Sequence, residues 1–369
     1  MAISVRKIQH PQKKTISVWV FSVLTAYLLL SRSSTVSQGI RDGMQLCVEV
    51  VIPSLFPFLV FTSFLMASGF AQRISSAIFP VTRYLFRLPQ QTGACILMSL
   101  IGGYPVGGRM IARLMQQQKL SRQDAERMLC FCINAGPSFV LTAVGVRLFG
   151  NAGIGILLLS AHLLASVTAG IWTGRHHPIP ELVQQSQPSQ PSLTGAMVTA
   201  VRESATGMLT LSAFIVLFSA ITALLQPICS QLGVWGSTLV SGLLEVTQGC
   251  VAASQLPSIT GELFAAFFLS FSGISVVCQV ISGFGTPVDP AKILFWRLIN
   301  GIFSTGWYAL LRFCFGALLE KADAVASWAY IGSTPVLHSS SVSTPMTICL
   351  LGVCAIAALT LDDKQNGNG

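Results

Sequence analysis

The chain has 369 residues, of which 52% are hydrophobic and 9% are charged, and its formal net charge is +9. Soluble domains contain about 25% charged residues, so this composition excludes a soluble globular protein and favours a polytopic membrane protein. The basic residues are scattered at the ends of apolar segments rather than gathered in one patch, which argues against nucleic acid as a partner.

The N-terminus combines basic residues with a short apolar segment. Arg6, Lys7, Lys13 and Lys14 precede residues 16–30, a pattern shared by signal peptides and uncleaved first helices. No small-x-small cleavage site follows, so we interpret the segment as an uncleaved first transmembrane helix. Because lysine and arginine beside spans set topology, we expect the N-terminus to be cytoplasmic.

Further apolar stretches long enough to cross a bilayer recur along the chain. They cover residues 50–72, 88–108, 128–146, 148–174, 204–244 and 263–288, and weaker segments cover 298–311 and 346–361. The sequence therefore predicts an all-α polytopic integral membrane protein with about eight to ten membrane segments.

A glycine-rich break, GGYPVGGR at residues 102–109, interrupts the second of these stretches. A helix that breaks at bilayer depth exposes backbone amides and carbonyls, which is tolerable only where protein or a water-filled cavity receives them. Basic residues on both sides of the stretch are most simply placed in the cytoplasm, which requires residues 88–108 to enter and leave by one face. We therefore expect a re-entrant hairpin and a solute site here.

Composition divides the chain into five parts. Residues 1–42 are the N-terminal basic segment and first helix, and residues 43–173 are a first half. A linker rich in proline, glutamine and serine covers residues 174–197. A second half covers residues 198–318, and residues 319–369 form a loop, a last helix and a polar tail.

The two halves share an order of interruptions. The first half contains the break at 102–109 and then CINAGPSF at 132–139, whereas the second contains GLLEVTQG at 242–249 and then SFSGIS at 270–275. Interrupted helices in corresponding positions of two repeats point to a transporter site near the membrane midplane. We therefore expect two gate-like repeats, arranged as inverted repeats, with a substrate site between them.

The candidate site residues lie at these interruptions. Glycines permit close backbone approach, and Tyr104 could stack on or hydrogen-bond an aromatic ring. Arg109 is either a counter-charge for carboxylates or an anchor at the membrane surface. The candidate substrate-binding residues are Gly102, Gly103, Tyr104, Pro105, Gly107, Gly108, Arg109, Asn134, Pro137, Ser138, Glu245, Ser272, Gly273, Ser275 and Gln279.

Three further positions also leave alternatives open. Asn134 and Ser138 flank Gly136-Pro137, where they either cap a broken helix and face the same cavity or belong to a packing turn. Glu245 ends a long uncharged run, and an intramembrane carboxylate raises a functional hypothesis by default. It could carry a coupling proton or cation, pair with Arg109 across the repeat interface, or form a structural salt bridge.

The cysteines and histidines do not indicate a metal or cofactor. The ten cysteines contain no CxxC pair and lie mostly within apolar segments, where they are typical of helix packing. His162 stands alone in an apolar stretch, and we expect it to form a hydrogen bond between helices. We predict no cofactor and no metal.

Five segments resemble, in their order and spacing, the sporulation members of the nucleoside recognition, or Gate-domain, membrane proteins. These segments are PSLFPF at 53–58, GGYPVGGR at 102–109, CINAGPSF at 132–139, GLLEVTQG at 242–249 and SFSGISVVCQ at 270–279. The resemblance runs from about residue 43 to residue 312. It implies export of dipicolinic acid from the mother cell across the outer forespore membrane of an endospore-forming bacterium.

The sequence thus predicts a transporter of a small organic anion with membrane lipid around it. A nucleoside-like solute is the alternative substrate, and a non-transporting scaffold needed for spore maturation is the alternative function. A homo-oligomer or partner proteins of the sporulation membrane remain open. An enzyme is disfavoured because HExxH, GxSxG and P-loop motifs are absent.

Overall fold

The computed structural model describes residues 19, 23, 26–180, 192–284 and 288–331, and every regular element within them is a helix. Among these described residues, four apolar helical stretches are long enough to cross a membrane: Ser33–Ala67, Ala152–Gly174, Leu193–Leu244 and Ser258–Ser282. The predicted all-α membrane fold is thereby confirmed. The expected segment at 346–361 and part of the one at 16–30 lie outside the described residues.

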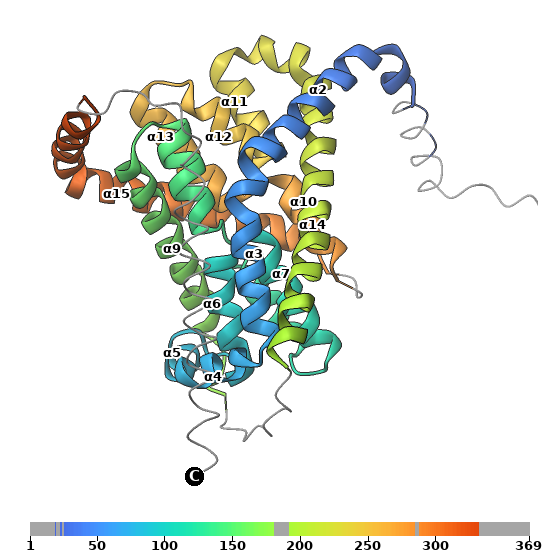
Figure 1. Ribbon diagram of the computed structural model, residues 1–369, viewed down its shortest axis with the longest axis vertical. Helices are drawn as coiled ribbons and strands as arrows, with labels where there is room; N and C mark the ends of the chain where they lie inside the picture. Colours follow the sequence, from blue (N-terminus) through green and yellow to red (C-terminus); the bar gives the residue numbers. More distant parts are fainter. Residues whose placement is uncertain (1–18, 20–22, 24–25, 181–191, 285–287, 332–369) are drawn as a thin grey trace, which may run out of the picture.

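The elements before the linker are mostly short helices between two long ones (Figure 1). They are α2 (Ser33–Leu46), η1 (Cys47–Val51), α3 (Ile52–Ala67), α4 (Phe70–Ala77), α5 (Phe79–Val81), η2 (Thr82–Phe86), η3 (Gln90–Thr92), α6 (Gly93–Gly102), α7 (Tyr104–Gln116), α8 (Arg122–Leu129), η4 (Phe139–Leu148) and α9 (Ala152–Gly174).

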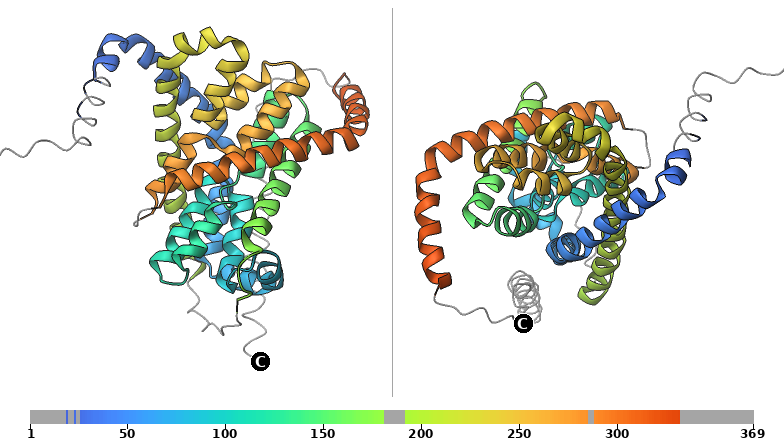
Figure 2. Two further views of the ribbon diagram at one scale, coloured as in Figure 1. Left: turned by 180° about the vertical axis from the view of Figure 1, so that it is seen from behind. Right: turned by 90° about the horizontal axis from the view of Figure 1, so that it is seen from above.

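The elements after the linker follow a comparable order, from one long helix through two interrupted pairs to another long helix. They are α10 (Leu193–Cys229), η5 (Ser230–Leu232), α11 (Gly233–Leu244), α12 (Val246–Ser254), α13 (Ser258–Phe271), α14 (Gly273–Ser282) and α15 (Pro290–Ile331). The last of these runs obliquely across one face of the molecule (Figure 2).

The long helix formed by α2, η1 and α3 packs antiparallel against α10 (Figure 1). Near one end, a Cβ on Gly43 would lie 2.7 Å from the hydroxyl of Ser219, so only glycine permits this approach. Near the other end, Ser204 donates to Ser63 at 3.3 Å. Residue numbers therefore rise along one helix as they fall along the other, and α3 and α10 run in opposite directions as inverted repeats require.

The first predicted break is present at Gly103, where φ is +84° and the chain reverses between α6 and α7. The thiol of Cys95 lies 3.8 Å from the carbonyl oxygen of Gly107. In a continuous helix these residues would be separated by roughly 18 Å along the axis, because each residue advances the helix by about 1.5 Å. The two helices therefore form a hairpin.

The corresponding break in the second half lies at Glu245, whose backbone is extended with φ −146° and ψ 126°. Helices α11 and α12 fold back on each other so closely that a Cβ on Gly249 would lie 2.2 Å from the Cα of Gly242. A side chain at either glycine would force these backbones apart. The second half therefore contains a hairpin like the one in the first.

Each hairpin tip meets a second interruption from its own half. Residues 132–136 are non-helical, and a Cβ on Gly136 would lie 3.4 Å from the Cα of Gly103. In the second half the break is at Ser272 and Gly273, with φ values of +70° and +77°. A Cβ on Gly273 would lie 3.2 Å from the Cα of Glu245. Both halves thus place two irregular backbones in contact.

Candidate functional site

An open cavity of about 530 Å³ lies between α3 and α7 of the first half and α10 and α14 of the second. Its volume falls within the roughly 300–1,000 Å³ typical of small-molecule sites. The lining residues are Thr62, Ser63, Met66, Val106, Arg109, Met110, Arg113, Arg202, Glu203, Thr206, Gly207, Thr210, Leu211, Gln279, Val280, Ser282 and Gly283. The cavity therefore lies between the two halves, next to their broken helices.

The charged residues of the cavity lining are mainly positive. Arg109, Arg113 and Arg202 face a single carboxylate, that of Glu203, among the residues that line it. Met66, Val106, Met110, Leu211 and Val280 supply an apolar wall. Guanidinium groups beside an apolar surface suit a ligand that carries carboxylates on a hydrophobic body.

Arg109 extends from α7 across the cavity to α10. Its Nη1 donates to the backbone oxygen of Glu203 at 3.2 Å. The guanidinium lies over Gly207, where a Cβ would approach Nη1 to 2.3 Å. Its Cγ lies 4.0 Å from the Cβ position of Gly283, which directly follows α14. Arg109 is therefore held between three helices of the cavity wall.

A smaller void of about 20 Å³, the inner void, lies beside this cavity and shares Leu211 and Gln279 with it. Tyr104 and Glu245, from the tips of the two hairpins, line the inner void together. The side chain of Gln279 is 8% exposed and donates from Nε2 to Ser275 at 3.3 Å. Its Oε1 has no hydrogen-bond partner within the described part of the chain, so it can bind a group that enters the cavity.

Glu245 caps its own helix instead of pairing with Arg109, which excludes that one of the alternatives open for it. One carboxylate oxygen accepts from the backbone N–H of Gln248 at 2.8 Å, and the other accepts from the hydroxyl of Thr247 at 3.2 Å. None of the salt bridges between described residues involves Glu245. The free N–H groups and positive dipole end of α12 stabilise the carboxylate, which removes the need for a cation.

Of the two alternatives for Asn134 and Ser138, the contacts favour a packing turn over a helix cap. Asn134 is fully buried and donates to the carbonyl of Phe131 at 2.9 Å and to the hydroxyl of Ser99 at 3.3 Å, while its oxygen accepts from Ser166. No side chain caps the start of η4 at Ser138. The side chain of Asn134 turns toward α6 and α9, and there it holds the irregular backbone in place.

Tyr104 joins the two halves at the first hairpin tip. Its hydroxyl donates to the carbonyl oxygen of Leu269, in the last turn of α13, at 2.8 Å. The ring is 5% exposed and forms part of the inner void. The polar end of Tyr104 is thus committed to a contact between the halves, and only its ring is available to the void.

His162 makes the interhelical hydrogen bond that its position predicts. Its Nε2 accepts from the backbone N–H of Ala135 at 3.0 Å, so the ring proton is on Nδ1, which donates to Ser270 at 2.6 Å. The imidazole therefore connects the irregular segment of the first half to the end of α13.

Arg297 is a buried cation that the sequence analysis missed. It is 0% exposed, and its guanidinium donates to the carbonyls of Ser270 and Phe271, the last residues of α13. A cation at a helix C-terminus is favourable because of the exposed carbonyls and the dipole there. The available signal was a single arginine in an apolar stretch.

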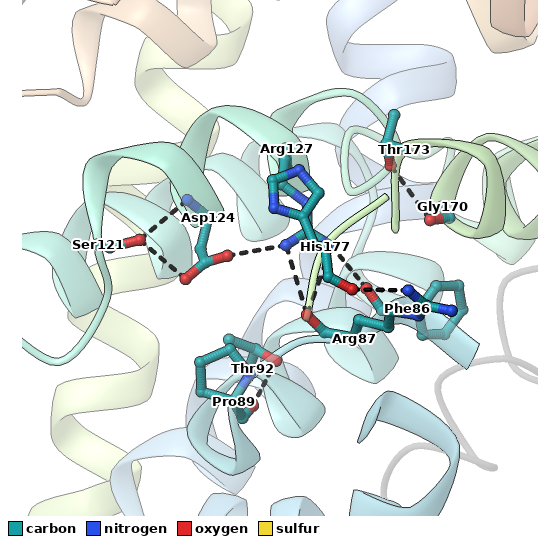
Figure 3. A network of polar contacts seen from close by, with 10 residues as sticks. All are labelled: Phe86, Arg87, Pro89, Thr92, Ser121, Asp124, Arg127, Gly170, Thr173 and His177. Carbon is teal, nitrogen blue, oxygen red and sulfur yellow. Dashed lines mark hydrogen bonds and ion pairs between the residues drawn. The ribbon is translucent and has the colours of Figure 1, made fainter. Parts of the chain in front are cut away.

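Two further arginines form hydrogen bonds at the end of the molecule where α8 contacts α9 (Figure 3). Arg127 binds Asp124 at 2.9 Å and the carbonyl of Phe86 at 2.7 Å. Arg87 donates to the carbonyl of His177 at 2.7 Å. Helices α4 and α5, which precede Arg87 in the chain, lie at the same end of the molecule as the start of α10 (Figure 1).

Comparison with known proteins agrees with this architecture. Residues 48–152 match the Gate family, described as nucleoside recognition. The chain is 29% identical over 331 residues to the sporulation integral membrane protein YlbJ of Bacillus subtilis (strain 168). The aligned region covers 79% of this chain and 81% of that protein. No solved structure matches. The chain is therefore an integral membrane protein that contains a segment matching the Gate family and is similar to YlbJ over most of its length.

Proposed function

We propose that the chain transports a small organic anion, dipicolinate, across the outer forespore membrane during sporulation. The observation that carries this proposal is the cavity of about 530 Å³ between the halves, with its three arginines and one carboxylate. Its position against the broken helices is where transporters built from repeats bind their substrates.

The chemistry of the cavity fits a planar aromatic dicarboxylate. Arg109 and Arg113 lie four residues apart on α7, so their side chains share one face of the helix and line the same cavity. Each guanidinium can bind one carboxylate in a planar fork. Apolar side chains such as Met110 and Val280 provide a surface for the ring.

The cavity opens toward the basic end of the molecule. Arg113 and Glu203, with side chains 54% and 43% exposed, stand at its mouth. The segments at this end carry many arginines and lysines, including Arg87, Lys119 and Arg122, which predicts that it faces the cytoplasm. A cavity open to the mother-cell cytoplasm is suited to collect a solute for export into the forespore.

The experiment that tests this function compares variants in a spore-forming bacterium that lacks its YlbJ. The wild-type chain is expected to restore the dipicolinate content of the spores, and Arg109→Ala, present at equal amounts in the membrane, is expected to fail. Arg147→Ala is the matched control because Arg147 lies outside the cavity and pairs with Glu49.

The same comparison separates transport from scaffolding. A scaffold needs helix packing but not a cavity counter-charge, so restoration of dipicolinate by Arg109→Ala would support the scaffold and contradict transport. A nucleoside substrate is favoured by the description of the Gate family. It predicts that nucleosides, but not dicarboxylates, compete with uptake into reconstituted vesicles.

A further inference from the structure

The cavity contains one carboxylate that works against the binding of an anion. Glu203 lies on α10, and its Oε1 lies 3.6 Å from Nη1 of Arg113 on α7. Resting on the proposed function, we propose that Glu203 is an internal competitor for the substrate, and that it determines how many carboxylates the cavity accepts.

The geometry of the pair favours exchange with a ligand. A separation of 3.6 Å satisfies an ion pair but exceeds the length of a good charge-assisted hydrogen bond, which is about 2.7–2.9 Å. Both side chains are about half exposed, at 54% and 43%. Ion pairs with this exposure contribute little stability, so a ligand carboxylate can replace Glu203 at low cost.

The same residue is in contact with both arginines of α7. Its backbone oxygen accepts from Arg109 at 3.2 Å, whereas its carboxylate pairs with Arg113. A monocarboxylate can bind at Arg109 while Glu203 remains on Arg113. A dicarboxylate that uses both guanidinium groups has to displace Glu203, which then turns toward solvent at the cavity mouth.

The charge of the lining leads to the same substrate class. Three arginines and one glutamate give the lining residues a net charge of +2, which a dianion neutralises. Removal of the negative charge of Glu203 favours binding of a dianion in two ways. Both ligand carboxylates lose a repulsive neighbour, and no internal carboxylate competes with them for Arg113. It acts on a monoanion through a single charge.

The experiment measures equilibrium binding of dipicolinate and of picolinate, its monocarboxylate analogue, to the purified full chain. Glu203→Gln is expected to tighten dipicolinate binding about twofold to fivefold, the range for one exposed ion pair, and to tighten picolinate binding less. Glu49→Gln is the matched control. Glu49 also pairs with an arginine at 3.3 Å and is 47% exposed, but it does not line the cavity.

Arg113→Gln gives a second measurement in the opposite direction. It is expected to weaken dipicolinate binding while picolinate binding changes less, so the inference is testable even if Glu203→Gln does not fold. An unchanged ratio of dipicolinate to picolinate affinity in either folded variant would overturn the role of Glu203.

The inference and the proposed function fail in different ways. If the wild-type chain binds dipicolinate but does not move it across a membrane, transport is contradicted and the affinity ratios still decide the role of Glu203. If the wild-type chain binds neither compound, both proposals are contradicted.

Discussion

Glu245 shows how one residue combines a structural role with a proposed functional one. Its carboxylate is 1% exposed and caps α12 through Gln248 and Thr247, at the inner void that it shares with Tyr104. A buried carboxylate without a cation is sensitive to any proton or cation that reaches it. We propose that it couples transport to an ion gradient.

Substitution of Glu245 separates the two roles. Glu245→Gln keeps an oxygen that can accept from Gln248, so the protein is expected to fold while uptake driven by a pH gradient falls. Glu245→Ala loses the cap, and the free energy of unfolding is expected to fall by about 0.5–2 kcal/mol. Uptake by Glu245→Gln that matches the wild type at every pH tested would remove Glu245 from the coupling mechanism.

The sequence predicted where the helices break better than it predicted which side chains contact each other. Gly103 and Glu245 were placed at breaks because glycine, proline and charge are local signals in an apolar sequence. The partners of Tyr104 and Arg297 could not be predicted in this way. Tyr104 and Leu269 are 165 residues apart in the sequence, and their contact depends on how two helices from different halves pack.

At the level of elements, the first hairpin depends on close contact with the segment at 132–136. A Cβ on Gly107 would lie 1.9 Å from the carbonyl oxygen of Cys132 and 2.8 Å from the Cβ of Ser99. The oxygen belongs to the backbone of a fully buried segment, so it cannot move aside as a flexible side chain could. The glycine at 107 is therefore required by packing, which is sufficient to explain it without a ligand.

Alanine at position 107 is therefore expected to destabilise the protein by about 1–3 kcal/mol or more, the usual cost of overpacking. Gly306→Ala is the matched control, because Gly306 lies in α15 and a Cβ there meets nothing within 4 Å. That change is expected to raise stability by about 0.5–1 kcal/mol. Thermal unfolding in detergent measures both, and equal melting temperatures for the two variants would contradict the packing of the hairpin.

The sequence predicted the hairpins better than the cavity. The glycine break and the flanking basic residues predicted the first hairpin, and the paired interruption predicted a broken helix in the second half; the structure has hairpins at Gly103 and Glu245. The cavity mouth was missed because Glu203 resembles an ordinary residue at the entry of a span. Only the placement of α7 across the cavity from α10 shows that Arg113 and Glu203 meet.

At the scale of the whole molecule, hydrogen bonds join the two halves on one side, and an open cavity separates them on the other. Tyr104 and His162 connect the broken segments of the first half to α13 of the second. On the other side, α3 and α10 leave an open cavity against α7 and α14. A substrate in this cavity would contact both halves, as transport between two repeats requires.

Uptake of dipicolinate into proteoliposomes that contain only this chain tests the central claim most directly. The wild-type chain is expected to take up dipicolinate above the level of protein-free vesicles, Arg147→Ala is expected to match it, and Arg109→Ala is expected to lose most of the uptake. Uptake by the wild-type chain that equals that of protein-free vesicles would contradict transport, and full uptake by Arg109→Ala would contradict the cavity as its route.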